Sequence, residues 1–432
     1  MTTRSSAIKK RLKKRSGEHR HSMSITPHSK EASDLLVRGS EELCEVQCNG
    51  IHVDIPYCKE KYGEVLRHLK GVREELDETK EMRLWENVYG SKTNLQSKQQ
   101  LSNILYNKME YEPIKYTENE QPSTTQEALS AIDTTFVNKY LEYDKFTRIK
   151  NNYLKVLINE SVDGKIYPFF NLNTAATYRS SSADPNFHSI PVRDEVIGPM
   201  VRKAIVPREG YHKVEIDYEG IEVHASAWNH QDQNMLEYIA NEDSDMHKDM
   251  STQIFKLDDL DDTNKNEKAI RKTVKNDFVF PEFYGDYYLS CAKALWGDIQ
   301  KYNLRLSDNT SLKKHLKNKG IKNRNQFIDH IQRIEDDFWG RRFNEYYQWR
   351  LDKIDKATKL GYLDSLNGFR FQGVLTKNAA VNYPIQCVAF HCLLWSLIQI
   401  NTKLRKEKWR SKIEGQIHDA IVADVHTKEL AS

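Results

Sequence analysis

One stretch decides the fold: Lys213-Val-Glu-Ile-Asp217-Tyr-Glu-Gly-Ile-Glu222. Val214 and Ile216 alternate with polar residues, which predicts a short strand that ends at Asp217. From Ile221 the composition becomes helical, so Asp217 stands at a strand-to-helix corner with Glu222 five residues on. Such a pair of acids is compatible with a divalent-metal site, although an Asp at a strand end more often caps a helix. The stretch alone leaves both interpretations open.

Three further stretches favour the metal site. They are Thr177-Tyr-Arg179-Ser-Ser-Ser-Ala-Asp-Pro185-Asn186-Phe-His188-Ser-Ile-Pro191, Arg271-Lys-Thr-Val-Lys275-Asn-Asp-Phe-Val-Phe280-Pro-Glu-Phe-Tyr284-Gly285 and Gln416-Ile-His418-Asp419. In this order, from about Glu45 nearly to Ser432, they resemble the polymerase domain of family A (polymerase-I-type) DNA polymerases. The resemblance implies an α+β right-hand fold with an antiparallel palm sheet, helical fingers and a helical thumb.

The resemblance also divides the chain into subdomains. We expect a basic, disordered tail over residues 1–40, a palm entry hairpin over 41–60 and a thumb over 61–160. The palm follows over 161–255, the fingers over 256–360 and a second part of the palm over 361–432. The layout leaves no room for a proofreading 3′–5′ exonuclease domain before the polymerase-like region, and it suggests a phage-type gene.

Composition limits the class of protein but does not identify a function. No run approaches the roughly 18 apolar residues of a membrane span, and no secretory signal is visible, so we expect a cytoplasmic protein without membrane contact. The net charge of +3 is misleading, because residues 1–22 carry eight Lys or Arg and one Glu. The remainder has 57 basic and 61 acidic residues, from 65 − 8 and 62 − 1. The basic tail either binds nucleic acid or a partner, or is simply solvated. The six cysteines form no CxxC pairs and indicate reduced thiols.

Local patterns predict the first elements. Val46 to Asp54 alternates around an Asn-Gly pair, which is typical of a hairpin. From Lys59 to Tyr89 a helical pattern follows, with apolar residues at three- and four-residue steps: Val65, Leu66, Leu69, Val72 and Leu76. Ser97 and Gln100 have the spacing of a capping box. The polar segment 117–126 is expected to be a flexible loop at the tip of the thumb. Near the end of the chain, residues 412–425 alternate around His418-Asp419, which predicts a hairpin with the acid at its tip.

The resemblance assigns the catalytic and metal-binding residues. Asp217, the carbonyl of Tyr218, and Asp419 would hold two Mg²⁺ ions, which prefer oxygen ligands. Two carboxylates that are distant in sequence but meet on one sheet are what two-metal phosphoryl transfer requires. Glu222 matches the steric gate of the family, where a ribose 2′-hydroxyl would clash, and therefore points to deoxynucleotides.

The fingers helix is implied to bind the dNTP. Arg271 and Lys275 lie one helical turn apart and would hold the triphosphate, with Lys275 also donating the proton to pyrophosphate. Phe280 would pack beneath the sugar and Tyr284 would stack at the templating position. The family spaces lysine and aromatic residue by four, whereas Lys275 and Phe280 are five apart, so we expect a π-bulge or a kink at Pro281. An alternative alignment, with Lys272 and Asn276 in the basic positions, loses the catalytic lysine.

The remaining site residues are also implied by the resemblance. His247, in Asp245-Met-His247, would reach the incoming phosphates, unless it is a surface or capping histidine. The residues expected to contact DNA are Arg179, Asn186, Asn382, Gln386, Gln416 and His418.

Three features depart from the family. His188 stands where the family has a template-contacting Gln, and Ala420 replaces the Glu after His-Asp. The chain also stops 13 residues after Asp419, from 432 − 419. The sequence predicts a template-directed DNA polymerase that extends a primer 3′ end. The alternatives are a weak or inactive primer–template-binding subunit, and extension of RNA primers or templates. Expected partners are primer–template DNA, dNTPs, and a separate exonuclease, a complementing C-terminal subunit or a processivity factor.

Overall fold

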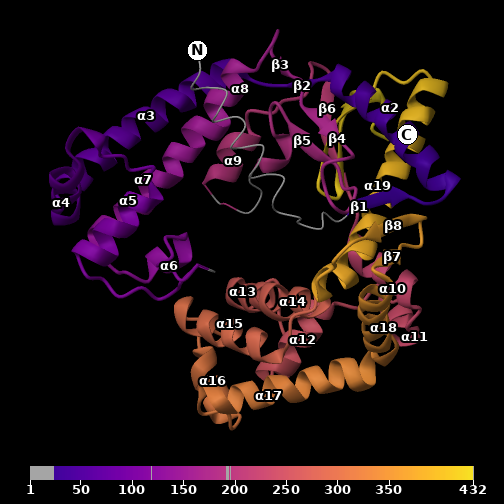
Figure 1. Ribbon diagram of the computed structural model, residues 1–432. Coiled ribbons are helices and arrows are strands. Elements are labelled where there is room, and N and C mark those ends of the chain that lie inside the picture. Colours follow the sequence, from indigo (N-terminus) through magenta and orange to yellow (C-terminus); the bar gives the residue numbers. More distant parts are fainter. Residues whose placement is uncertain (1–23, 118, 191–193, 195, 432) are drawn as a thin grey trace, which may run out of the picture. The chain divides into compact units, whose positions relative to one another are not determined.

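The structure is a computed structural model that describes residues 24–117, 119–190, 194 and 196–431 (Figure 1). The basic segment 1–22, predicted to be a solvated or binding tail, lies outside the described residues. The chain forms two units. The first comprises residues 1–42, 172–180 and 217–400, and the second comprises residues 43–171, 181–216 and 401–432.

The first unit is mainly helical. Its helices are α2 (Lys30–Asn49, which continues into the second unit), α10 (Ile221–His230), α11 (Gln233–Ala240), α12 (Met246–Phe255), α13 (Lys265–Val274), η5 (Lys275–Val279), α14 (Phe280–Phe283), α15 (Tyr288–Lys301), α16 (Leu312–Asn318), α17 (Arg324–Asp337), η6 (Phe338–Arg342), α18 (Asn344–Leu360) and α19 (Lys377–Lys406, which also continues into the second unit). Its strands are β1 (Ser24–Pro27), β7 (Tyr362–Asp364) and β8 (Phe369–Gln372), in the order β1-β8-β7.

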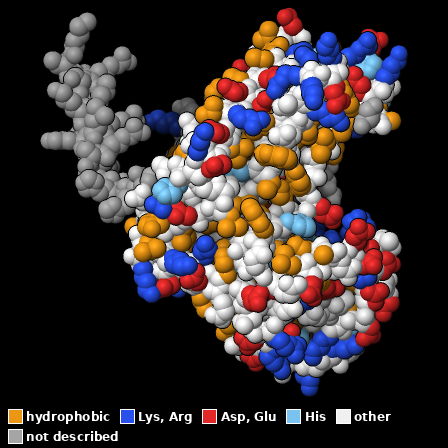
Figure 2. All heavy atoms as spheres, turned by 90° about the vertical axis from the view of Figure 1, so that its right-hand side faces the viewer, with side chains coloured by type: hydrophobic (Ala, Val, Ile, Leu, Met, Phe, Trp, Pro, Cys, Tyr) orange, Lys and Arg blue, Asp and Glu red, His pale blue; other side chains and the backbone are white. Residues whose placement is uncertain are grey.

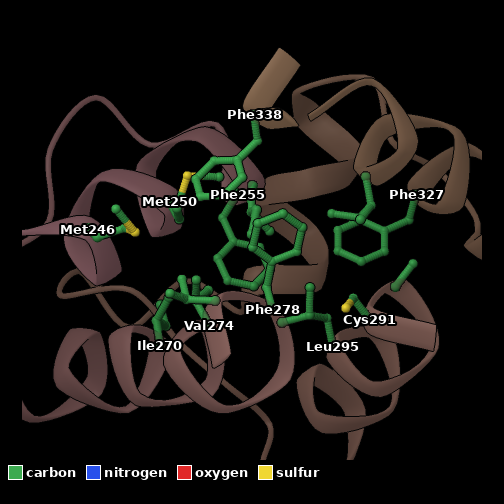
Figure 3. Packing of buried hydrophobic residues seen from close by; sticks show 14 of the residues in the cluster. Met246, Met250, Phe255, Ile270, Val274, Phe278, Cys291, Leu295, Phe327 and Phe338 are labelled. Carbon is green, nitrogen blue, oxygen red and sulfur yellow. The ribbon is translucent and has the colours of Figure 1, made fainter. Parts of the chain in front are cut away.

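An aromatic and aliphatic core fixes α12 to α17 of this unit. Figure 3 shows Phe255, Phe278 and Phe338 pointing toward one another between these helices, with Met250 and Val274 beside them. Burial of such side chains is worth about 1.5–3 kcal/mol each, so the core determines where the polar face of α13 and η5 lies.

Helix α19 is 30 residues long and contains an apolar window of 18 residues. By length and composition it could cross a membrane, but 61% of its most apolar window is buried within the protein, as in a core helix. Gly39 of α2 packs against it, and a Cβ there would lie 2.6 Å from Leu394. The helix therefore serves as a core element on which α2 rests.

The second unit combines a helical half with a β half. Its helices are α3 (Ile55–Asp77), α4 (Lys80–Tyr89), η1 (Gly90–Lys92), α5 (Lys98–Ser102), η2 (Asn103–Lys108), α6 (Gln126–Ser130), α7 (Thr135–Arg148), η3 (Ile149–Leu154), α8 (Lys155–Asn159), η4 (Phe187–Ser189), α9 (Ile197–Arg202) and η7 (Thr427–Glu429). Its strands are β2 (Ile51–His52), β3 (Lys165–Ile166), β4 (Phe169–Asn171), β5 (Ser181–Ala183), β6 (Tyr211–Asp217, whose last residue falls in the first unit), β9 (Lys412–Ile417) and β10 (Ala420–His426).

The strands of this unit form three small sheets. β6, β10 and β9 are neighbours in that order, β2 pairs with β3, and β4 pairs with β5. β9 and β10 form the predicted antiparallel hairpin around His418-Asp419. The expected strand β6 and helix α10 are likewise confirmed, and β6 ends at Asp217.

The helical half packs around Trp85. α3 and α7 run side by side (Figure 1), and the indole N–H of Trp85 donates to Gln100 Oε1 at 2.9 Å. Ser97 caps α5 as predicted, accepting the amide of Gln100 at 3.2 Å. The side chain of Gln100 accepts the amide of Asn94 instead of closing the capping box. The predicted helix 59–89 is broken at Thr79, which caps α4, and Leu66 is exposed rather than buried.

Two expectations near the N-terminus are wrong. The disordered tail predicted for residues 1–40 is not disordered over 24–40, because β1 pairs with β8 and α2 begins at Lys30. The hairpin predicted around Asn49-Gly50 is absent. Gly50 follows the end of α2 with φ +66°, where a Cβ would lie 2.6 Å from Tyr167, and β2 pairs with β3. The Asn-Gly pair is therefore a helix end, a role that glycine shares with hairpin turns.

The described surface and thiols agree with the composition. Figure 2 shows Lys or Arg and Asp or Glu side chains interspersed over one face. All six cysteines are free.

Candidate active site

Glu222 of the first unit is held by two donors. It lies in the first turn of α10, after Gly220 with φ +60°. The Arg179 guanidinium donates to its Oε1, and the Tyr284 hydroxyl donates to its Oε2 at 2.5 Å. Hydrogen bonds to an ionised acceptor are about twice as strong as neutral ones, so both oxygens are fixed in direction. The gate candidate, one predicted DNA contact and one predicted dNTP contact thus form a single cluster.

The π-bulge predicted between Lys275 and Phe280 is confirmed. α13 ends at Val274, η5 is a π-helical turn, and the amide of Phe280 donates to the carbonyl of Lys275. The wider turn absorbs the extra residue, so Lys275 Nζ lies 5.1 Å from the centre of the Phe280 ring. Phe280 and Tyr284 follow with ring centres 6.1 Å apart. This geometry agrees with the preferred alignment, while Lys272 is exposed.

Arg271 and His247 lie beside this face. Asp245 caps α12 and accepts the Arg271 guanidinium at 2.7 Å and 2.8 Å. Burial opposes ionisation of Asp245, but the Lys248 amide and Arg271 hold the pKa of its carboxyl below the usual value. Burial, then the charges of Lys275 and Arg271, lowers the pKa of His247 to about 4, so its ring is neutral at pH 7. The face therefore carries two cations and a neutral imidazole.

A small pocket opens behind Glu222. It is lined by Glu222, Val223, Ser226, Phe280, Phe283, Tyr284, Tyr346, Asn382, Ile385 and Gln386. The Asn382 side chain donates to the Tyr284 carbonyl at 3.0 Å, which ties α19 to the end of α14. Sequence reasoning missed Ser226 and Tyr346. Ser226 could have been predicted, since it lies four residues after Glu222 on the same helical face. Tyr346 could not, because it lies in a charged helical segment without motifs.

The second unit carries the other acidic candidate. Asp419 and His418 form the two-residue turn between β9 and β10, closed by the pair Ile417 and Ala420. His418 has φ +51°, and its carbonyl accepts the Gln416 side-chain amide. Asp217 belongs to the first unit, so the meeting of the two carboxylates stays a prediction.

Tyr218 and Asn186 have structural partners. The Tyr218 hydroxyl lies 2.6 Å from Ser396 Oγ, which fixes the side chain next to Asp217. Asn186 Oδ1 accepts the amide of Ser189 at 3.1 Å and so caps η4. The predicted DNA contact of Asn186 would have to coexist with this cap.

A third acidic cluster lies within the second unit. One ligand atom from each of His52, Glu414 and Asp424 falls within 4.8 Å of the others. Lys213 pairs with Glu414, and Arg208 donates to Asp424 at 2.5 Å, so the two carboxylates are already neutralised. We interpret the cluster as an ion-pair network, because a divalent cation would add uncompensated charge to a buried site.

Comparison with a solved structure identifies the fold. The chain matches "POL domain of Pol1 from M. smegmatis complex with DNA primer-template and dNTP" with a TM-score of 0.71 and 24% identity, over 91% of this chain and 64% of that one. The likeness shows an α+β polymerase-domain fold, as predicted.

The family follows from the sequence comparisons. The model of DNA polymerase family A matches residues 64–299, more than half of the chain, and the chain belongs to this family. DNA polymerase I of Lactococcus lactis subsp. cremoris is 27% identical over 92% of this chain and 42% of its own length. The thermostable DNA polymerase I of Thermus filiformis is 31% identical over 51% of this chain and 26% of its own. The chain thus spans well under half the length of these relatives.

Proposed function

We propose that the protein is a DNA-directed DNA polymerase that adds dNTPs to a primer 3′ end by two-metal phosphoryl transfer. The observation that carries the proposal is the cluster around Glu222. Its carboxylate, fixed by Arg179 and Tyr284, stands at a pocket that Phe280 also lines. The proposal includes action in the cytoplasm without an intrinsic exonuclease, which a separate chain would supply.

Each residue of the cluster has a role in this proposal. Arg271 and Lys275 bind the triphosphate, and Lys275 gives a proton to the leaving pyrophosphate. His247, neutral because its pKa is low, donates a hydrogen bond to a phosphate rather than a charge. Phe280 and Tyr284 stack on the nucleotide and the templating base. Glu222 excludes a 2′-hydroxyl, while Arg179, Asn382 and Gln386 contact the minor groove.

The donor set at the acidic residues suits magnesium. Asp217, the Tyr218 carbonyl and Asp419 offer oxygen only, the ligand type that Mg²⁺ prefers. Bound there, two Mg²⁺ ions would lower the pKa of the primer 3′-hydroxyl and neutralise the pyrophosphate. Asp217 stands at the end of strand β6, and Asp419 stands in the two-residue turn between β9 and β10.

Primer extension tests the proposal. The purified chain, with a labelled primer–template, dNTPs and Mg²⁺, should add nucleotides in template order, and Asp217→Ala should not. Binding of primer–template should be measured in parallel with both proteins. Extension that survives in D217A would contradict the proposed role of Asp217.

A second candidate is a binding subunit without useful catalysis. It is favoured by Ala420, which leaves the position after His418-Asp419 without a carboxylate. Tight primer–template binding with no extension by the wild type would support this candidate over the first.

A further inference from the structure

His188 of the second unit makes an unusual set of contacts. Its Nε2 lies 2.7 Å from the carbonyl oxygen of Gln416 in β9. Its ring centre lies 5.8 Å from that of Phe170 and 6.0 Å from that of His418. A carbonyl only accepts, so Nε2 must carry the proton. The side chain thus links η4 to the strand that leads into the Asp419 turn.

The Gln416 carbonyl needs such a partner. β9 is the edge strand in the order β6-β10-β9, and one side of an edge strand presents unpaired backbone groups. Gln416 is itself 2% exposed, so water has little access to it. A buried carbonyl that loses its donor is destabilised.

The element that carries His188 is seated closely on β9. Phe187 is buried, and a Cβ at Gly415 would lie 2.9 Å from its ring. Asn186 caps η4, which fixes the backbone of His188. His188 is therefore held both at its backbone, by η4, and at its ring, by the Gln416 carbonyl.

We infer that His188 is a positioning residue, which holds the His418-Asp419 turn by donating to the Gln416 carbonyl. The inference rests on the proposed role of Asp419. Gln416 transmits the constraint, because its main chain accepts from His188 while its side-chain amide donates to the His418 carbonyl. The turn is thereby fixed from outside the hairpin as well as by the pair Ile417 and Ala420.

Charge state agrees with this role. Burial lowers the pKa of His188 to about 4, with the Gln416 carbonyl opposing the shift. The ring is neutral at pH 7 and has one N–H, which the carbonyl uses.

Three variants of the full chain test the inference. His188→Phe keeps the ring but removes the donor, and His188→Gln restores an amide donor the same number of bonds from the backbone. His212→Phe makes the same ring exchange at an exposed position of β6 and serves as the control. Each is measured by amide hydrogen exchange over residues 413–422, by kcat and KM for a dNTP, and by primer–template binding.

We expect H188F to exchange faster in this segment and to lose about tenfold in kcat, since small misplacements of a reacting group are costly. KM and primer–template Kd should stay within about twofold of the wild type. H188Q should recover most of the loss, and H212F should match the wild type.

Unchanged exchange and kcat in H188F would overturn the inference. So would weaker primer–template binding with unchanged kcat, which would make His188 a template contact. If the wild type extends no primer, the proposed function fails, but the exchange comparison still decides whether His188 holds the turn.

Discussion

The two candidate regions differ in how their functional groups are held. In the first unit, side chains hold side chains: Glu222 is bonded by Arg179 and Tyr284, and Arg271 by Asp245. In the second unit, the backbone presents Asp419 on a two-residue turn, and a hydrogen bond from His188 supports the neighbouring strand. A side-chain network can be loosened one donor at a time, whereas a turn is either formed or lost. Removing one donor in the first region should therefore loosen its carboxylate only in part, whereas loss of the turn itself in the second would displace Asp419 altogether.

The largest graded effect should come from Lys275. Lys275→Ala removes the proposed proton donor and should slow single-turnover dNTP addition about a thousandfold, within the range of general acid catalysis. Lys272→Ala, at an exposed position of α13, should change the rate less than about threefold. The reverse pattern would favour the alternative alignment, which places Lys272 and Asn276 in the basic positions.

Glu222 should control sugar selection. Glu222→Ala should raise ribonucleotide relative to deoxynucleotide incorporation by about a hundredfold, measured as the ratio of kcat/KM values. Tyr284→Phe removes only one of the two donors that fix the carboxylate and should raise the ratio about threefold. Equal effects of the two variants would show that losing one donor impairs sugar selection as much as losing the carboxylate itself.

Glu282 extends the side-chain network into the core of the first unit. It is buried and accepts the Trp339 indole N–H at 2.8 Å. Burial, then the charge of Glu335, raises the pKa of Glu282 from its usual 4.5 to about 8. The folded chain therefore binds a proton that the unfolded chain releases, and stability falls as pH rises from about 4.5 to about 8.

Glu282→Gln should remove part of this dependence. We expect the unfolding free energy of the wild type to decline by about 4 kcal/mol more than that of E282Q across this window, at about 1.4 kcal/mol for each pH unit between the two pKa values. Calorimetry at several pH values measures the difference. Parallel curves would mean that Glu282 is not protonated in the folded protein.

The smallest expected effect on stability concerns the packing of η4 against β9. Gly415→Ala should lower the unfolding free energy by about 1–2 kcal/mol, because the new Cβ meets the buried Phe187 ring. Gly71→Ala is the matched control within the same unit. It lies in α3 with nothing within 4 Å, and should stabilise the chain by about 0.5–1 kcal/mol. A stabilising G415A would contradict the close packing that carries His188.

Sequence patterns predicted the parts of both regions that depend on local order. The strand ending at Asp217, the hairpin at His418-Asp419 and the π-turn after Lys275 follow from alternation and from a count of residues. Local patterns failed where the partner is remote. β1 pairs with a strand more than 300 residues away, and Gly50 is required by contact with Tyr167 rather than by a hairpin. The hydrogen bond of His188 to Gln416 was equally invisible, because it links residues 228 positions apart.

The most direct test of the account is a double-mutant cycle between Asp217 and Asp419. Single-turnover primer extension is measured for the wild type, D217A, D419A and the double variant, with primer–template binding as the control. If both carboxylates serve one metal centre, each single variant should lose about a thousandfold, or about 4 kcal/mol, and the double variant should be no slower. Losses that multiply in the double variant, or a single variant that keeps wild-type rates, would contradict a shared centre.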